Sequence, residues 1–271
     1  MAQKKDTARS RSPHDTESAK SGVALSGGNM NAPVKMGSEV HRSAGVHTPT
    51  IHRLLTHVRA RGVDWVPRPL SCDGTTEVLT YLDGDVPHDM PSWIWDGSVL
   101  RTVARRLRCW HDATADFPRE GALWSFSTGQ EDEVICHNDF APYNCVFQNG
   151  TFSGLIDFDL CAPGSRLWDM TYCAYRFVPL MSDAPLAVGQ EFAPFPLGTV
   201  LERLEIFLDE YSRGDPPFRY GAGTLLQKTA ERLDRIADWT ADFAARSGNT
   251  VLAGNAIMYR DHAGWIRSLG G

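Results

Sequence analysis

Three oxygen-bearing side chains are expected to gather at one end of a β-hairpin. An Asn-Gly pair at 149–150 lies between two β-prone runs, which is a strong local signal for a two-residue turn. With that turn, Asn144 pairs with Leu155, and Asp157 lies beside Asn144 at the open end. Diagonal neighbours on paired strands lie about 7–8 Å apart, so both side chains could reach one ion. Asp139, five residues before Asn144, would enter the same end.

Carboxylate and amide oxygens suit Mg²⁺ better than zinc. A protein-bound Mg²⁺ usually takes one or two protein oxygens together with substrate phosphates. A further carboxylate that lies near the ion without binding it can accept a proton from a hydroxyl group. Asp and Asn also cap turns through their side chains, which is the structural alternative for these residues. The hairpin geometry favours the ion site over turn capping.

Two segments around the hairpin resemble a known catalytic pattern. Residues 137–144, HNDFAPYN, resemble the H-x-D-x-x-x-x-N catalytic loop of the protein-kinase-like superfamily. Residues 156–159, IDFD, resemble its metal-binding D-F-G segment. Together these variants resemble the aminoglycoside phosphotransferase family and its small-molecule kinase relatives. Further segments resemble that family in the same order along the chain: LSGG at 25–28, LRCWHDA at 107–113 and PGSRLWD at 163–169.

The resemblance implies an α+β, bilobal protein-kinase-like fold, with a small N-terminal β-rich lobe and a larger, mainly helical C-terminal lobe. It also implies ATP (or GTP) and Mg²⁺ as cofactors. Asp139 would be the catalytic base or would orient the acceptor hydroxyl, while Asn144 and Asp157 would hold Mg²⁺ between the nucleotide phosphates. His137 would brace the loop, and Asp169 would accept hydrogen bonds from its backbone amides. Phosphoryl transfer needs mainly positioning and charge neutralisation, which these parts supply.

The nucleotide is expected to contact the N-terminal part of the chain. Gly27 and Gly28 would form the opening loop, and the backbone between Thr80 and Leu82 would meet the adenine at a hinge. Kinases hold the phosphates with a strand lysine paired to a helix glutamate. The matching strand here has no lysine, so Arg42 is the predicted substitute, because guanidinium also binds phosphate well. His41 is its rival, and the helix at 50–61 contains neither Asp nor Glu.

Several other residues have more than one interpretation. Arg42 could be a surface charge, and Asp159 could make a structural hydrogen bond or bind a second metal. His111-Asp112 could indicate an HD-type metal phosphohydrolase, but its place within an apolar-periodic helix favours packing or capping. Four tryptophans could line an acceptor pocket, although aromatic residues more often belong to the core: Trp93, Trp95, Trp124 and Trp168.

The local pattern predicts the elements that carry these residues. Two short strands are expected around Gly37-Ser38, and another strand at 77–82. A helix should follow Thr48-Pro49, with Pro just after the N-cap, and end near Gly62. Apolar periodicity predicts three more helices, at 99–114, 201–211 and 224–243.

Composition limits the class of protein. The chain has 271 residues, 42% of them hydrophobic, and a net charge of −6, which argues against a general nucleic-acid binder. No apolar run is long enough to span a membrane, and the N-terminus lacks the apolar part of a secretory signal. The six cysteines form no C-x-x-C pair, so we expect a cytoplasmic protein. Residues 85–271 hold 16 Lys and Arg against 25 Asp and Glu, which suggests a cationic acceptor.

These observations predict a disordered tail at 1–21, a nucleotide-binding lobe at 22–83 and a catalytic and acceptor-binding lobe at 84–271. The leading hypothesis is an ATP- and Mg²⁺-dependent phosphotransferase that moves the γ-phosphate to a hydroxyl of a small molecule, aminoglycoside-like or another small alcohol. No nucleic acid or membrane is expected as a partner. The alternative is a kinase-fold binding or immunity protein with weak or no catalysis, because the lysine–glutamate pair is missing. The HD-type hydrolase is a third possibility.

Overall fold

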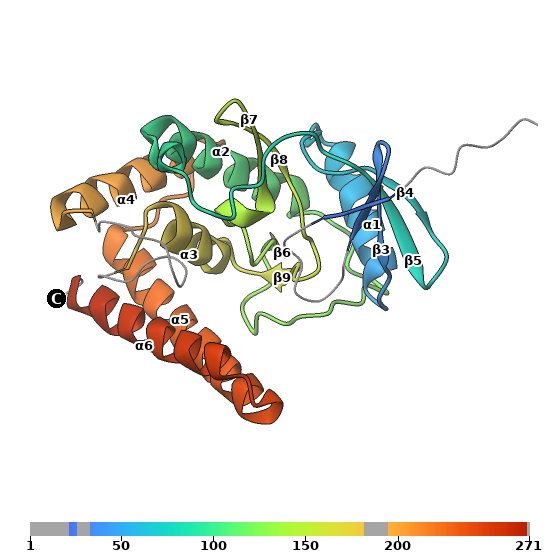
Figure 1. The fold of residues 1–271 in the computed structure, drawn as a ribbon. Coiled ribbons are helices and arrows are strands. Elements are labelled where there is room, and N and C mark those ends of the chain that lie inside the picture. Colours follow the sequence, from blue (N-terminus) through green and yellow to red (C-terminus); the bar gives the residue numbers. More distant parts are fainter. Residues whose placement is uncertain (1–21, 26–32, 182–194, 270–271) are drawn as a thin grey trace, which may run out of the picture.

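The computed structural model describes residues 22–25, 33–181 and 195–269. The predictions for the tail at 1–21 and for Gly27 and Gly28 lie outside these residues. The described chain combines a small N-terminal sheet with a larger helical part (Figure 1). The predicted α+β, bilobal fold class is therefore confirmed, while the exact lobe boundaries stay a prediction.

The N-terminal sheet has five strands, and each neighbouring pair is antiparallel. In their spatial order the strands are β1 (Val23–Ala24), β2 (Val34–Met36), β3 (Glu39–Ser43), β5 (Thr76–Thr80) and β4 (Pro69–Cys72). The turn between β2 and β3 places Gly37 at a φ of 66°, a value that glycine adopts without strain. The two strands expected around this turn are thus present.

Helix α1 (Thr48–Arg59) packs beside this sheet, as Figure 1 shows. Its buried face repeats at helical spacing and includes Ile51, Leu54, Leu55 and Val58. Two details of the prediction were wrong. His47, not Thr48, is the N-cap, and the helix ends at Arg59 because residues 60–62 form a turn.

Five longer helices build the C-terminal part: α2 (Gly97–Thr114), α3 (Arg166–Phe177), α4 (Leu197–Ser212), α5 (Ala222–Ser247) and α6 (Thr250–Leu269). Helices α5 and α6 run side by side along the lower edge of the molecule in Figure 1. Periodicity predicted α2, α4 and α5 but missed α3 and α6. Helix α6 buries only Ala256, His262, Ala263 and Ile266. None of the helices in the described ranges is long and apolar enough to cross a membrane.

Two small antiparallel sheets carry the segments between α2 and α3. Strand β6 (Val134–Cys136) pairs with β9 (Ala162–Gly164), and β7 (Cys145–Gln148) pairs with β8 (Thr151–Leu155). Short 3-10 turns lie at η1 (Ser92–Trp95) and η2 (Pro142–Asn144).

The predicted hairpin is present, but its register differs from the prediction. Gln148 pairs with Thr151 across the Asn-Gly turn as expected. A bulge then shifts the register, so that Leu155 lies opposite Cys145 and not opposite Asn144. A bulge places two residues of one strand opposite one of its partner, and Ser153 is the residue without a partner here. Asn144 is instead the last residue of η2, and its carbonyl accepts a hydrogen bond from the Ile156 amide at 2.9 Å.

Gly84 marks the passage from the sheet to the helical part. Its φ is 140°, and a Cβ at this position would lie 2.5 Å from the carbonyl oxygen of Phe147. The next residue, Asp85, pairs with Phe147 through two backbone hydrogen bonds of 2.8 and 2.9 Å. Only glycine allows this close approach of the two backbones. The connection therefore ties the end of the sheet to the β7–β8 hairpin.

Candidate functional site

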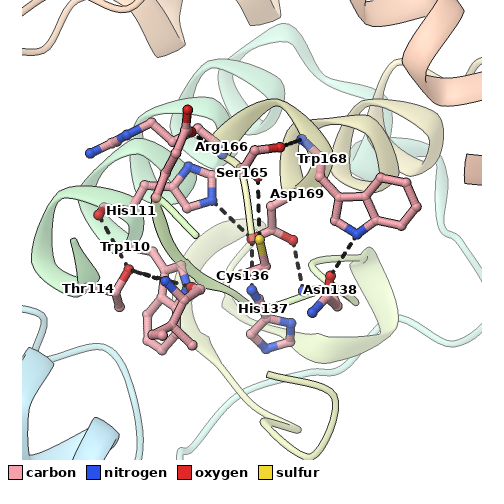
Figure 2. Close-up of polar contacts among 12 residues, drawn as sticks. Trp110, His111, Thr114, Cys136, His137, Asn138, Ser165, Arg166, Trp168 and Asp169 are labelled. Atoms are coloured by element: carbon pink, nitrogen blue, oxygen red, sulfur yellow. Dashed lines mark hydrogen bonds and ion pairs between the residues drawn. The ribbon is translucent and has the colours of Figure 1, made fainter. Parts of the chain in front are cut away.

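A buried carboxylate holds the loop that carries Asp139. Asp169 lies in the first turn of α3 and accepts hydrogen bonds of 2.8 Å from the amides of His137 and Asn138 (Figure 2). His111 of α2 bonds the same carboxylate at 3.0 Å. Burial raises the pKa of Asp169, but the hydrogen bond from His111 and the charge of Arg232 together lower it by more, so the net direction is downward. The carboxylate is therefore an ionised anchor for the loop, with the hydrogen bonds that the sequence led us to expect.

Asn138 has a backbone conformation that needs this support. Its φ is 66°, which is uncommon for a residue other than glycine, although asparagine tolerates it better than most. The side-chain oxygen accepts a hydrogen bond from the Trp168 indole, and the side-chain amide donates to the Leu160 carbonyl at 2.8 Å. Arg232 of α5 donates to the backbone carbonyl of Asn138 at 2.6 Å. The loop is thus fixed from three sides.

His137 joins the loop to the segment that carries Asp157. Its Nε2 lies 3.1 Å from the Ile156 carbonyl, and its Nδ1 accepts a hydrogen bond from the Asp139 amide at 3.3 Å. Burial lowers the pKa of His137, while Asp169 and Asp139 raise it by less. The neutral ring can donate from Nε2 and accept at Nδ1 at the same time, as both contacts require.

Two hydrogen bonds orient the Asp139 carboxylate. Tyr143 donates to Oδ1 at 2.6 Å, and the Asn144 amide donates to Oδ2 at 2.9 Å. Both partners come from the same short turn, η2, so the sequence spacing itself brings them to Asp139. The half-buried carboxylate has one fixed orientation, and each oxygen keeps a lone pair for a further partner.

Asn144 and Asp157 fit the donor set of a Mg²⁺ site. The Asn144 nitrogen donates to the Asp139 carbonyl, which can only accept, so its oxygen points elsewhere and takes no hydrogen bond from a described residue. Asp157 has a φ of 63°, an uncommon conformation that turns its side chain out of the strand direction. Burial raises the pKa of Asp157 to about 6, helped by Asp159 and opposed by Arg42. The raised pKa means that the ionised form of Asp157 is disfavoured, and a bound cation would stabilise that form.

Arg42 lies in an ion network that the sequence reasoning only partly anticipated. Its Nε donates to Glu77 at 2.5 Å, and its two terminal nitrogens bond Asp159 at 2.8 and 3.2 Å. Asp157 lies 3.9 Å from it. Burial lowers the pKa of Arg42, but these carboxylates raise it more, and the net direction is upward. The proposed substitute for the strand lysine is thus directed at the Asp157 segment.

Glu77 was missed, although the strand register could have found it. Glu77 lies directly opposite Arg42 on the neighbouring strand β5 and is only 1% exposed. Its second oxygen bonds His52 of α1 at 2.8 Å. The acid comes here from the sheet, while the helix supplies a histidine. This arrangement supplies a buried acid to Arg42 although α1 contains no Asp or Glu.

Asp159 lies among basic side chains rather than at an open position. Besides Arg42, it contacts Nε2 of His47 at 3.4 Å. The rival of Arg42, His41, bonds Glu39 at 3.1 Å and has no contact with this network. The Asp159 carboxylate therefore has two basic partners, which agrees with a structural role. No second metal is needed to explain its position.

The other predicted residues take structural positions. The Thr80 amide and hydroxyl pair with Arg68, while the Leu82 backbone amide donates to no described backbone group. The tryptophans pack against neighbouring rings or charges: Trp93 on Phe147, Trp124 on Phe117, Trp95 on Phe195, and Trp168 under Arg232 and Arg235. None of these contacts forms an acceptor pocket.

His111 and Asp112 do not form a shared site. Fully buried His111 bonds Asp169 and the Tyr211 hydroxyl, whereas Asp112 pairs with Arg108 and Arg166. Across the described ranges, no three His, Cys, Asp or Glu side chains are grouped so as to hold a metal ion. This geometry does not support the HD-type hydrolase. It agrees with the alternative interpretation, in which His111 has a packing role.

Comparisons with known proteins extend these findings. Residues 94–207 match the model of the phosphotransferase enzyme family, APH. The trifolitoxin immunity protein of Rhizobium leguminosarum bv. trifolii is 30% identical over 149 residues, which cover 52% of this chain and 56% of that protein. The chain thus spans little more than half of that curated relative.

Solved structures show the same fold at low identity. A Plasmodium vivax ethanolamine kinase superposes with a TM-score of 0.63 at 12% identity, covering 92% of this chain and 84% of that one. The GDP complex of an aminoglycoside 2'-phosphotransferase-IIIa gives 0.62 at 11% identity, covering 92% and 94%. The resemblance to the aminoglycoside phosphotransferase family is confirmed: residues 94–207 carry the pattern of the phosphotransferase enzyme family, within the fold of small-molecule kinases.

Proposed function

We propose that this protein transfers the γ-phosphate of ATP or GTP to a hydroxyl group of a small molecule, with Mg²⁺. The family match and the kinase neighbours support a phosphotransferase. The observation that carries the specific proposal is the oriented Asp139 carboxylate, beside an Asn144 oxygen that accepts no hydrogen bond from a described residue, and Asp157. The GDP-bound neighbour supports nucleotide use in this fold.

In the proposed reaction, the acceptor hydroxyl attacks the γ-phosphorus, and Asp139 takes up its proton. The new bond joins the acceptor oxygen to phosphorus, while the bond to the bridging oxygen breaks and leaves its electron pair on the nucleoside diphosphate. Tyr143 and Asn144 hold the carboxylate so that the hydroxyl meets it in one orientation. Bound at the Asn144 and Asp157 oxygens, Mg²⁺ would neutralise phosphate charge.

Arg42 is proposed to bind nucleotide phosphate from the sheet side. Its Nε is tied to Glu77, which fixes the guanidinium plane. Its terminal nitrogens point at Asp159. A phosphate that reaches Arg42 must therefore take the place of the Asp159 carboxylate. Binding then exchanges one anion for another at the same donors, and the charge of Arg42 never lacks a partner.

The test is an ATP-consumption screen over amino sugars, macrolides, choline-like alcohols and nucleosides. Asp139→Asn should lower the transfer rate by about 10²–10⁴, the range for loss of a positioned acid–base group. Asp242→Asn, an exposed position on α5, is the matched control and should retain the wild-type rate. Full transfer activity in Asp139→Asn would disprove the proposed role.

A second function is favoured by one specific finding. One curated relative is named a trifolitoxin immunity protein, a name that refers to immunity and not to group transfer. The chain could thus bind a ligand and protect without catalysis. Thermal unfolding with and without Mg-ATP distinguishes the two functions, because a ligand that binds the folded state raises Tm. No shift with Mg-ATP or Mg-GTP would favour the binding protein.

A further inference from the structure

A buried guanidinium for which the described residues supply no ion-pair partner lies close to the catalytic loop. Arg176 is in the last turn of α3, and only 7% of its surface is exposed. Its Nε atom has no hydrogen-bond partner. The groups that act most strongly on it are tyrosines and not carboxylates: Tyr143, Tyr172, Tyr175 and Tyr259. Burial of an unpaired charge is costly, so proteins seldom keep one without a use for it.

One tyrosine separates this charge from the proposed base. The Cζ atom of Arg176 lies 5.1 Å from the centre of the Tyr143 ring. The hydroxyl of the same tyrosine donates to Asp139 at 2.6 Å and lies 2.9 Å from the Tyr172 hydroxyl. Tyr143 is partly exposed. A small molecule beside Tyr143 would thus have a carboxylate at one end and a guanidinium at the other.

The remaining groups of this cluster are neutral at physiological pH. Burial raises the pKa of both Tyr143 and Tyr172 well above the ordinary value. Burial and the charge of Arg176 lower the pKa of His262 to about 4. The Nε2 atom of His262 is also buried without a hydrogen-bond partner. Two orphaned nitrogens therefore lie around Tyr175, whose ring is 5.8 Å from both His262 and the Arg176 guanidinium.

Two other buried arginines, Arg203 and Arg232, differ from Arg176 in how their donors are used. Arg203 donates to the carbonyls of Trp95, Phe177 and Val178. Arg232 donates to the carbonyls of Trp168 and Asn138. These side chains hold backbone segments together through their N–H groups. Arg176 instead lies over the rings of Tyr143 and Tyr175, and its Nε donor has no hydrogen-bond partner among the described residues.

We propose that Arg176 binds a carboxylate group of the acceptor, whose hydroxyl lies at Asp139. The acceptor class is then a small hydroxy acid. A carboxylate matches the planar donors of a guanidinium in a way that a neutral alcohol cannot. This proposal rests on the proposed phosphotransfer at Asp139. The acidic balance of residues 85–271 suggested a cationic acceptor, whereas Arg176 is a local positive charge. The two differ because net charge is a sum over many residues and does not report the charge at one site.

Matched alcohols that differ by a carboxylate test the proposal. Serine is compared with ethanolamine, and glycerate with glycerol, in the ATP-consumption assay with wild-type protein, Arg176→Gln and Arg176→Lys. Wild type should prefer the acid of a pair. Arg176→Gln should raise KM for that acid at least tenfold and leave KM for the member without a carboxylate unchanged, with partial recovery in Arg176→Lys. Arg260→Gln, at an exposed position on α6, is the control. Equal use of both members, or a preference that survives Arg176→Gln, would overturn the proposal.

Binding without transfer keeps the two proposals separable. The Tm of Asp139→Asn is measured with each acid and with each alcohol that lacks a carboxylate. A rise with serine or glycerate alone, absent when Arg176→Gln is added, supports the acid site even where no alcohol is phosphorylated. In that case the phosphotransfer proposal fails and the binding site stands. No rise with either acid overturns the acid site, whatever the transfer assay gives. A Tm for Arg176→Gln equal to or above that of wild type is expected, because the substitution removes an unpaired buried charge.

Discussion

At the scale of single residues, the site depends on which side chains satisfy one another. Asp139 has its orientation set by Tyr143 and Asn144, and both lie within five residues of it. Arg42 has its orientation set by Glu77, which is 35 residues away in the chain. The first arrangement follows from a short sequence motif. The second exists only because β3 and β5 pair in the register that places these two residues opposite each other.

Glu77→Gln is expected to weaken nucleotide binding. The substitution removes the buried negative charge that is paired with Arg42. Asp159 is then the one carboxylate that still hydrogen-bonds the guanidinium among the described residues. Loss of a hydrogen bond to a charged group costs about 1.5–3 kcal/mol, so Kd for Mg-ATP should rise roughly ten- to a hundredfold. Titration of Mg-ATP measures the change, with acceptor KM as the second readout. Glu39→Gln, on β3, is the control. An unchanged Kd would show that Glu77 does not position Arg42.

At the scale of elements, two connections position the site. Asp169 in the first turn of α3 holds the amides of the loop that follows β6, so the start of one helix fixes the end of one strand. Gly84 fixes the end of the sheet against the β7–β8 hairpin. The bulge in that hairpin places Asn144 outside the strand, where its side chain meets Asp139. A regular two-residue hairpin would have put Asn144 within the ladder.

Gly84→Ala should destabilise the fold. The added Cβ would lie 2.5 Å from the Phe147 carbonyl, and a φ of 140° is strained for alanine. We expect a loss of about 1–3 kcal/mol in the free energy of unfolding, from strain at a sparsely populated backbone conformation. Urea unfolding measures it. Gly74→Ala, with a φ of 92° and open space around it, separates the steric effect from the backbone effect. If both variants lose the same stability, the close contact at Gly84 has no separate cost.

At the scale of the whole molecule, buried neutral histidines connect stability to pH. His111 and His137 are fully buried, and burial lowers the pKa of each. His262 shows the same direction, with a pKa of about 4. All three hold long-range contacts, between α2 and α3, between the loop and the Asp157 segment, and between α3 and α6. The fold therefore keeps these rings uncharged where an unfolded chain would protonate them.

Stability should fall as pH drops from about 6.5 towards 4. In this range the unfolded chain binds protons at these histidines that the folded chain does not, so the free energy of unfolding rises with pH. Each such histidine contributes on the order of 1 kcal/mol per pH unit. His262→Gln should make the slope shallower, whereas His88→Gln, at an exposed position, should leave it unchanged. Urea unfolding at a series of pH values measures the slope, and an unchanged slope in His262→Gln contradicts this assignment.

The sequence by itself determined the features that depend on near neighbours in the chain. Periodic apolar residues gave α1, α2, α4 and α5, the Asn-Gly pair gave the β7–β8 turn, and the HNDFAPYN segment gave Asp139 and its partner Asn144. These depend on spacing within a few residues, where helix and turn geometry are fixed. Helices α3 and α6 were not predicted, because α3 is buried on nearly every side and the few buried residues of α6 form no clear stripe.

The tertiary structure alone decided the features that depend on distant contacts. The Glu77 partner of Arg42 and the position of Arg176 over the Tyr143 ring both arise between elements that are far apart in the chain. Which side chains lie next to a buried charge depends on how whole elements pack together. The acidic balance of residues 85–271 therefore could not report the positive charge that lies over the Tyr143 ring.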